Sequence, residues 1–138
     1  MTPTLRGSCL CGTVQYQVDD AFDYALNCHC SNCRRATGAA FKPFAGIAAS
    51  RLQVLAGADA LMRWSRDGRS GDTDAHDARC RHCGSLLWSR LREGTWLRLT
   101  LGSLLDEPSI RPSAHLFVGS KAPWYTITDD LPQHAEFG

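Results

Sequence analysis

Short stretches of alternating polar and apolar residues run along this chain, and no stretch keeps a clear helical period. Residues 13–18, TVQYQV, alternate in this way, which is typical of a strand with one buried face. Further short strands are predicted at 23–28, 40–47, 52–57, 60–66, 85–90, 95–101 and 113–120. Pro43 marks an edge or a bulge, because proline cannot donate a ladder hydrogen bond. The pattern predicts a mainly β domain of short strands with little helix.

The segments between these strands are rich in turn residues. Residues 31–38 are predicted to form one helical turn, with Ser31 as its N-cap and Gly38 closing it. Residues 67–77 are polar and rich in glycine and aspartate, which is typical of a mobile loop or an irregular hairpin. The tail after the last strand is predicted to be irregular and anchored by Trp124.

Length, composition and charge narrow the class of protein. The chain has 138 residues, of which 43% are hydrophobic, so we expect a single globular domain, 1–138. The formal net charge is only +1, which argues against a nucleic-acid partner. The first twelve residues lack the apolar core of a signal peptide, and no apolar run approaches the ~20 residues of a membrane span. We therefore expect a cytoplasmic protein with no membrane partner.

Seven cysteines fall into three close groups: Cys9-x-Cys11, Cys28-x-Cys30-x-x-Cys33 and Cys80-x-x-Cys83. Gaps of one or two residues are typical of metal chelation, because residues i and i+2 of a strand face the same side. In the last group, Gly84 can take the positive φ that closes a zinc-knuckle turn. An odd number of thiols in a reducing compartment argues against structural disulfides. The sequence therefore predicts bound Zn²⁺.

Ligand counting suggests how the three groups pair. A closed structural zinc site uses four ligands, which the first and last groups supply together: Cys9, Cys11, Cys80 and Cys83. The middle group offers only three, Cys28, Cys30 and Cys33, and would leave an open position, as in catalytic zinc sites. Counting alone leaves another division open, with Cys9, Cys11, Cys28 and Cys30 in one site and Cys33, Cys80 and Cys83 in the other. The closeness of the middle three thiols favours the first division.

Three further residues are candidates for a general acid beside an open zinc site: His29, Arg34 and His115. His29 lies between two cysteines that face the metal, so in a strand it points away, and a surface or second-layer position is favoured. Arg34 could be turned back toward the metal by the predicted helical turn. His115 lies in a predicted strand, where a packed and hydrogen-bonded role is the alternative to an acid.

Four stretches of the sequence resemble the glutathione-dependent formaldehyde-activating enzyme family, whose relatives include centromere protein V. They are GSCLCGTVQY, CHCSNCRRATG, CRHCGSLLW and the C-terminal stretch 102–137. The resemblance covers roughly 6–137 and implies a β-tent of short antiparallel strands stapled by zinc. It implies that Cys9, Cys11, Cys80 and Cys83 bind a structural zinc. It also implies that Cys28, Cys30 and Cys33 bind a second, labile zinc, partly occupied in some preparations, that contacts a thiol substrate.

The family reaction joins glutathione and formaldehyde reversibly, so the resemblance implies a carbon–sulfur lyase or synthase acting on a small thiol and a small aldehyde. Arg79 stands where members commonly have an aromatic residue, and the acidic loop 67–77 is also unlike theirs. These differences leave the identity of both substrates open. Two other functions remain as alternatives: a non-catalytic, zinc-stabilised binding module, and a thiol-redox or metal-handling protein.

Overall fold

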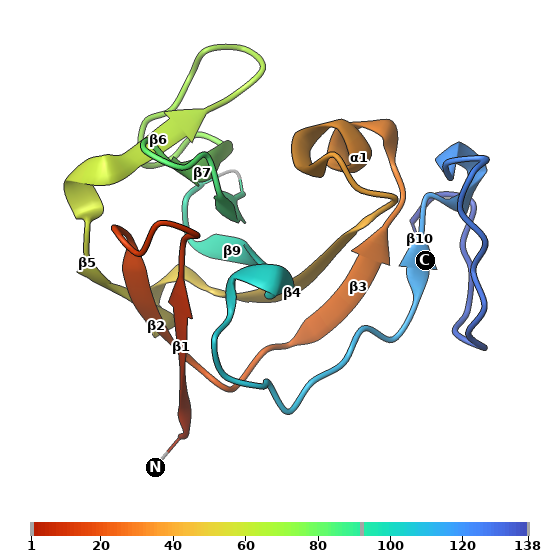
Figure 1. The fold of residues 1–138 in the computed structure, drawn as a ribbon, viewed down its shortest axis with the longest axis horizontal. Helices are drawn as coiled ribbons and strands as arrows, with labels where there is room; N and C mark the ends of the chain where they lie inside the picture. Colours follow the sequence, from red (N-terminus) through yellow and green to blue (C-terminus); the bar gives the residue numbers. More distant parts are fainter. Residues whose placement is uncertain (1, 92, 138) are drawn as a thin grey trace.

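Two β-sheets form the framework of the protein in the computed structural model, which describes residues 2–91 and 93–137 (Figure 1). The smaller sheet has three antiparallel strands in the order β1-β2-β5. They are β1 (Thr4–Ser8), β2 (Gln15–Asp19) and β5 (Leu52–Ala56). Strand β2 shows the predicted alternation, because Tyr16 and Val18 are buried while the polar residues beside them are more accessible.

The larger sheet has seven strands in the order β10-β3-β4-β9-β8-β7-β6. Their bounds are β3 (Tyr24–Cys28), β4 (Lys42–Ala48), β6 (Leu61–Trp64), β7 (His76–Cys80), β8 (Leu86–Arg90), β9 (Trp96–Thr100) and β10 (His115–Leu116). Neighbouring strands are antiparallel, except that the short β10 runs parallel to β3. The expectation of purely antiparallel strands is therefore wrong at this edge.

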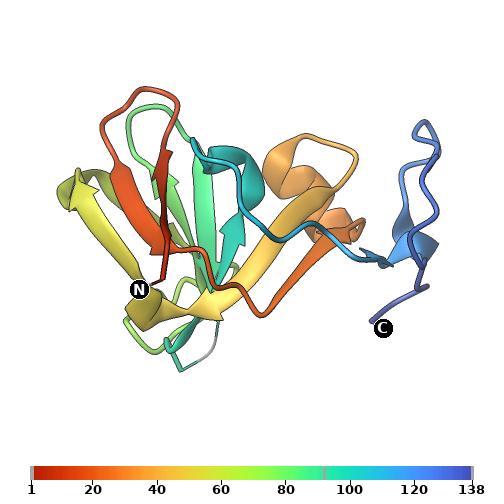
Figure 2. The same cartoon turned by 90° about the horizontal axis from the view of Figure 1, so that it is seen from below.

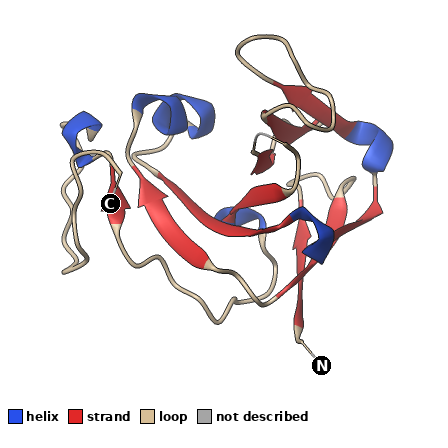
Figure 3. Cartoon of the chain, turned by 180° about the vertical axis from the view of Figure 1, so that it is seen from behind, coloured by secondary structure: helices blue, strands red, loops and turns tan. Residues whose placement is uncertain are grey.

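Helical structure is limited to short segments, as Figure 3 shows in blue. The α-helix α1 (Ser31–Thr37) connects β3 to β4. The described residues also form four 3₁₀ turns: η1 (Ala49–Arg51), η2 (Ala58–Ala60), η3 (Leu101–Ser103) and η4 (Val118–Ser120). Within the described residues, no helix is long and apolar enough to cross a membrane. The prediction of a small, mainly β domain with little helix is confirmed.

Apolar side chains from both sheets form one core. Leu5, Tyr16 and Val18 come from the smaller sheet, and Ile47 and Leu97 are among those from the larger one. The rings of Tyr16 and Trp88 meet edge to face across this core, with their centroids 5.7 Å apart. The two sheets are therefore held face to face by apolar burial, which is the main favourable term in folding.

The C-terminal tail lies at the end of the molecule away from the smaller sheet (Figure 2). It is irregular, as predicted, but Trp124 does not anchor it, because 70% of this residue is exposed. The tail is held by its main chain instead. The His115 N–H donates to the Pro132 carbonyl at 2.8 Å, and the His134 N–H donates to the His115 carbonyl at 2.9 Å.

Two strands were not predicted from the pattern, β1 and β7. Strand β1 has a single buried apolar side chain, Leu5, flanked by a glycine and polar residues, so its pattern is weak. Strand β7 begins inside the segment 67–77, and the residues before it join β6 to β7 as an irregular hairpin. Pro43 lies in β4, which is interior in the sheet, but pairing with β9 begins only at Phe44. Among the described residues, Pro43 therefore has no ladder partner on the β9 side, as at an edge, although β4 as a whole is an interior strand.

The junction between β5 and η2 gives a test of this packing. Gly57 has a φ of +78°, and a Cβ there would lie 2.1 Å from the carbonyl oxygen of Thr13 in the β1–β2 connection. We expect Gly57→Ala to lower the free energy of unfolding by about 2–4 kcal/mol, from left-handed strain and steric overlap together. Urea denaturation measures this loss.

Gly68→Ala is the matched control, because Gly68 has a φ of +80° and a Cβ there meets no described atom within 4 Å. It should cost only the left-handed strain, about 1–2 kcal/mol. Equal losses in the two variants would contradict the close approach of the Thr13 carbonyl.

Candidate functional site

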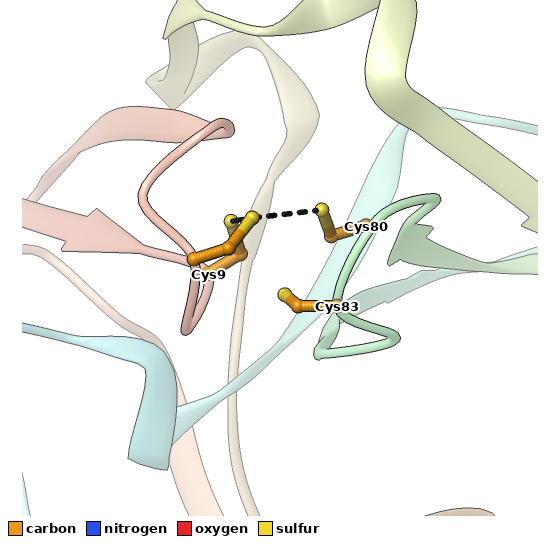
Figure 4. Close-up of side chains that lie close together, drawn as sticks. Cys9, Cys80 and Cys83 are labelled. Carbon is orange, nitrogen blue, oxygen red and sulfur yellow. Dashed lines mark hydrogen bonds between the residues drawn. The ribbon is translucent and has the colours of Figure 1, made fainter.

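Four thiols meet where the β1–β2 connection approaches the end of β7. Cys9 and Cys11 come from the connection, Cys80 ends β7, and Cys83 lies in the turn that follows. All four sulfur atoms lie within 4.8 Å of one another, and Figure 4 shows Cys9, Cys80 and Cys83 around a common space. Gly84 has a φ of +79°, which is the positive value expected for the residue closing this turn. The structure thus brings together the set of four that the sequence analysis favoured.

Hydrogen bonds favour the thiolate form of two of these thiols, Cys83 and Cys11. The Ser85 hydroxyl is the main cause that lowers the pKa of Cys83 to about 5, and Thr13 lowers the pKa of the exposed Cys11. The Val14 N–H donates to the Cys9 sulfur at 3.2 Å. Burial raises the pKa of Cys80 to about 11, so its thiol stays protonated at neutral pH unless a cation takes the place of the proton.

The donor set fits a tetrahedral thiolate-bound ion. A Zn–S bond of about 2.3 Å in tetrahedral geometry implies sulfur atoms about 3.8 Å apart. The Cys9–Cys11 and Cys11–Cys80 sulfur distances are 3.6 and 3.8 Å. Four soft sulfur ligands at this spacing are typical of zinc or iron–sulfur sites, and not of magnesium or calcium.

A second set of thiols gathers where β3 ends and α1 begins. Cys28 ends β3, Cys30 follows it, and Cys33 lies in the first turn of α1, with their sulfur atoms within 4.8 Å of one another. The N-cap of α1 is Cys30 and not Ser31, because the Cys33 N–H donates to the Cys30 sulfur at 3.3 Å. Gly38 ends the helix in the left-handed conformation, as predicted.

The three thiols share protons unequally. A hydrogen bond from the Cys33 thiol is the main cause that lowers the pKa of Cys28 to about 6, and the same bond raises the pKa of Cys33. The β3–β4 register sets Cys28 opposite Lys42, whose positive charge favours both thiolates. Before any metal is considered, Cys28 is therefore the thiol that favours the thiolate form, and Cys33 keeps its proton as the donor to it.

Lys42 is a functional candidate that the sequence analysis missed. It is only 7% exposed, and its ammonium donates to the Ser89 hydroxyl at 3.3 Å. That hydroxyl in turn donates to the Asp77 carboxylate at 2.6 Å. A buried lysine needs such compensation, and a lone lysine between the apolar residues of FKPF was the available sequence signal.

A second polar chain passes behind the three-cysteine cluster. His29 and His115 are both buried, and their Nε2 and Nδ1 atoms are 2.8 Å apart. His115 Nε2 lies 3.0 Å from a carboxylate oxygen of Asp129. Because the carboxylate only accepts, neutral rings satisfy this chain when each histidine carries its proton on Nε2. His29 thus occupies the second-layer position favoured from the sequence, and burial lowers its pKa to about 4.

The remaining sequence candidates have different surroundings. His115 uses both ring nitrogens within the His29–His115–Asp129 chain. Arg34 is half-buried on α1, and its Nε has no hydrogen-bond partner among the described residues. Arg79 donates to the Ala36 carbonyl at 2.6 Å and to the Gly84 carbonyl at 3.0 Å. It therefore bridges the end of α1 and the turn that carries Cys83.

The His29–His115–Asp129 chain can be tested by its tautomers. In Asp129→Ala, His115 loses the acceptor that holds the proton on Nε2, so proton density should appear on Nδ1 and the bond to His29 should weaken. Long-range ¹H–¹⁵N spectra of the two imidazole rings measure this change. Asp130→Ala is the neighbouring control, and identical His115 nitrogen shifts in both variants would contradict the chain.

Comparison with known proteins gives a consistent family assignment. The family model described as "Glutathione-dependent formaldehyde-activating enzyme" matches residues 4–120. A Halomonas elongata protein named "Putative glutathione-dependent formaldehyde-activating enzyme" is 29% identical over 130 residues, which cover 89% of this chain and 80% of that protein. The crystal structure of a Rhodobacter sphaeroides protein is similar with a TM-score of 0.57 and 27% identity, over 78% of this chain and 92% of that one. This chain belongs to the glutathione-dependent formaldehyde-activating enzyme family.

Proposed function

We propose that this protein is a carbon–sulfur lyase that adds a small thiol of the glutathione type to formaldehyde or another small aldehyde, reversibly. The observation that carries the proposal is the three-thiol cluster of Cys28, Cys30 and Cys33, which lies apart from the four-thiol cluster and beside a buried lysine. The family match and the relative's printed name support glutathione and formaldehyde as the substrate pair.

We propose that each cluster holds a zinc ion and that the two ions have different roles. Cys9, Cys11, Cys80 and Cys83 would complete a closed four-sulfur site, which stabilises the fold. Cys28, Cys30 and Cys33 would hold a second ion with only three protein ligands. Such an ion, when bound, supplies a Lewis-acidic position that favours the thiolate form of a substrate thiol. The free thiols of both clusters support a reducing compartment, and we place the protein in the cytoplasm.

The residues around the three-cysteine cluster supply charge and position. Lys42 offsets the negative charge that three thiolates bring to a partly buried place. Arg34, half-buried on the same helix as Cys33, is the proposed donor to the oxygen of the aldehyde as negative charge develops there. His115 forms a hydrogen bond with His29, which lies between Cys28 and Cys30, and so fixes the position of that segment. We therefore give His115 a positioning role ahead of the acid role considered from the sequence.

The proposed reaction needs no redox partner. The thiol sulfur forms a bond to the aldehyde carbon, the carbonyl π bond breaks, and the proton lost by the thiol is balanced by the proton gained on oxygen. The reverse reaction cleaves the same carbon–sulfur bond. The protein contributes by binding both reactants in one place and stabilising the charges that form during the addition.

The proposed metal roles predict different outcomes for two matched cysteine variants. Metal analysis of the purified protein should find up to two zinc ions per chain. Cys30→Ser should lose one of them and keep a cooperative thermal unfolding transition. The neighbouring control Ser31→Ala should keep both ions and the same transition. Cys80→Ser should lose the cooperative transition, because a structural zinc contributes on the order of 10 kcal/mol to folding. A folded, zinc-loaded Cys80→Ser protein would refute the structural role.

The activity is tested against the spontaneous reaction of the same compounds. Exchange spectroscopy with ¹³C-formaldehyde and glutathione should show faster adduct exchange with the zinc-loaded protein than without it. Cys30→Ser should abolish the acceleration, and Lys42→Met should reduce it about tenfold, the effect of roughly 1.4 kcal/mol in the barrier. Thermal unfolding checks that each variant is folded. Failure of the zinc-loaded protein with a panel of small thiols and aldehydes would favour a binding module.

A further inference from the structure

A cleft that belongs to neither cysteine cluster opens between α1 and the β6–β7 hairpin. Its volume is about 700 Å³, and three arginines line it: Arg35 from α1, Arg66 after β6, and Arg79 from β7. Asn32, Trp64 and Asp77 complete its polar and aromatic lining. We call this the arginine cleft. Its size is that of a small-molecule site.

The three guanidinium groups of the arginine cleft have no carboxylate within ion-pair distance among the described residues. Arg66 donates to the Asn32 side-chain oxygen at 2.7 Å, Arg79 donates to two main-chain carbonyls, and Arg35 makes one long bond of 3.4 Å to the Ser31 carbonyl. These neutral partners fix the side chains, and three arginines with one aspartate give the cleft lining a formal charge of +2. The carboxylate of Asp77 is engaged by the Ser89 hydroxyl.

The arginine cleft is connected to the three-cysteine cluster in two ways. Helix α1 carries Cys33 and also the cleft residues Asn32 and Arg35. On the sheet side, Asp77 accepts from Ser89, which accepts from Lys42, and Lys42 pairs in register with Cys28. A ligand in the cleft would therefore lie against the same helix and the same hydrogen-bonded chain that surround the reactive thiols.

We propose that the arginine cleft binds the carboxylates of the thiol substrate, and so selects small thiols that carry carboxylate groups. Planar guanidinium groups match carboxylates with paired hydrogen bonds, and a site with three unpaired arginines attracts a multiply charged anion. Trp64, 53% exposed, offers a flat face to the uncharged part of such a ligand. The identification of the ligand as the substrate rests on the function proposed above.

The test measures binding without chemistry. S-methylglutathione keeps both carboxylates and lacks a free thiol, and its diethyl ester lacks the carboxylates as well. ¹H–¹⁵N spectra of the folded, zinc-loaded protein, followed at the Trp64 indole and the arginine Nε groups, report binding in the cleft. We expect S-methylglutathione to bind saturably, with an affinity that falls as salt is added. We expect the diethyl ester to bind about tenfold more weakly.

The double variant Arg35→Gln/Arg66→Gln should weaken S-methylglutathione binding at least about tenfold and leave ester binding unchanged. Arg79 is kept, because its bonds join two parts of the fold. Arg111→Gln is the control, since Arg111 is exposed, lies outside the cleft and pairs with Glu107. It should bind S-methylglutathione as the unmodified protein does.

Three results would overturn the proposal: equal binding of acid and ester, spectral changes that spare Trp64 and the cleft arginines, or displacement by inorganic phosphate as effective as by S-methylglutathione itself. The last would show a general anion site. Because binding is measured without adduct formation, its failure is separate from failure of the proposed reaction. Carboxylate-dependent binding with no accelerated adduct exchange would support the cleft and reject the lyase.

Discussion

The convergence of four thiols at one place is the constraint on which the rest of the structure depends. Cys11 and Cys80 are 69 positions apart: Cys11 lies in the β1–β2 connection of the smaller sheet, and Cys80 ends β7 of the larger one. A metal that joined them would close a long loop and remove much of the entropy of the unfolded chain. The apolar core between the sheets is modest in size, so such a link would hold together the faces that Tyr16 and Trp88 already bring into contact.

The three-cysteine cluster is supported from several sides by elements far apart in the sequence. Strand β4 places Lys42 beside it, and β10 pairs with β3 so that His115 reaches His29. The C-terminal tail contributes Asp129 and the main-chain bonds that hold β10. The short parallel pair of β10 and β3 is thus explained by what it carries: a buried polar chain that fixes the segment between Cys28 and Cys30.

Much of this arrangement could be predicted from local sequence, and the failures have physical causes. The cysteine spacing indicated which thiols form each close group, because chelation within a group is a short-range property of a turn or strand. The joining of the first and last groups was only favoured, by ligand counting that left another division open. The roles of Lys42 and Asp129 could not be predicted, since each depends on strand register or on a tail contact that no local pattern encodes. Ser31 has the composition of an N-cap, yet the Cys30 sulfur takes that position, because the geometry that gathers the thiols also turns the Cys30 side chain toward the helix. Trp124 shows that a large aromatic residue in a tail need not be buried.

Arg79 connects helix α1, which carries Cys33, to the turn that carries Cys83. One guanidinium holds a carbonyl at the end of α1 and a carbonyl in the turn of Cys83, while its side chain also forms part of the cleft wall. A lysine would hold these two carbonyls less firmly, because it lacks the rigid planar fork of arginine. Arg79 is therefore one of the contacts that hold the turn of Cys83 against α1. A substitution at this one position would change both a wall of the cleft and the contact between α1 and this turn, without replacing any thiol.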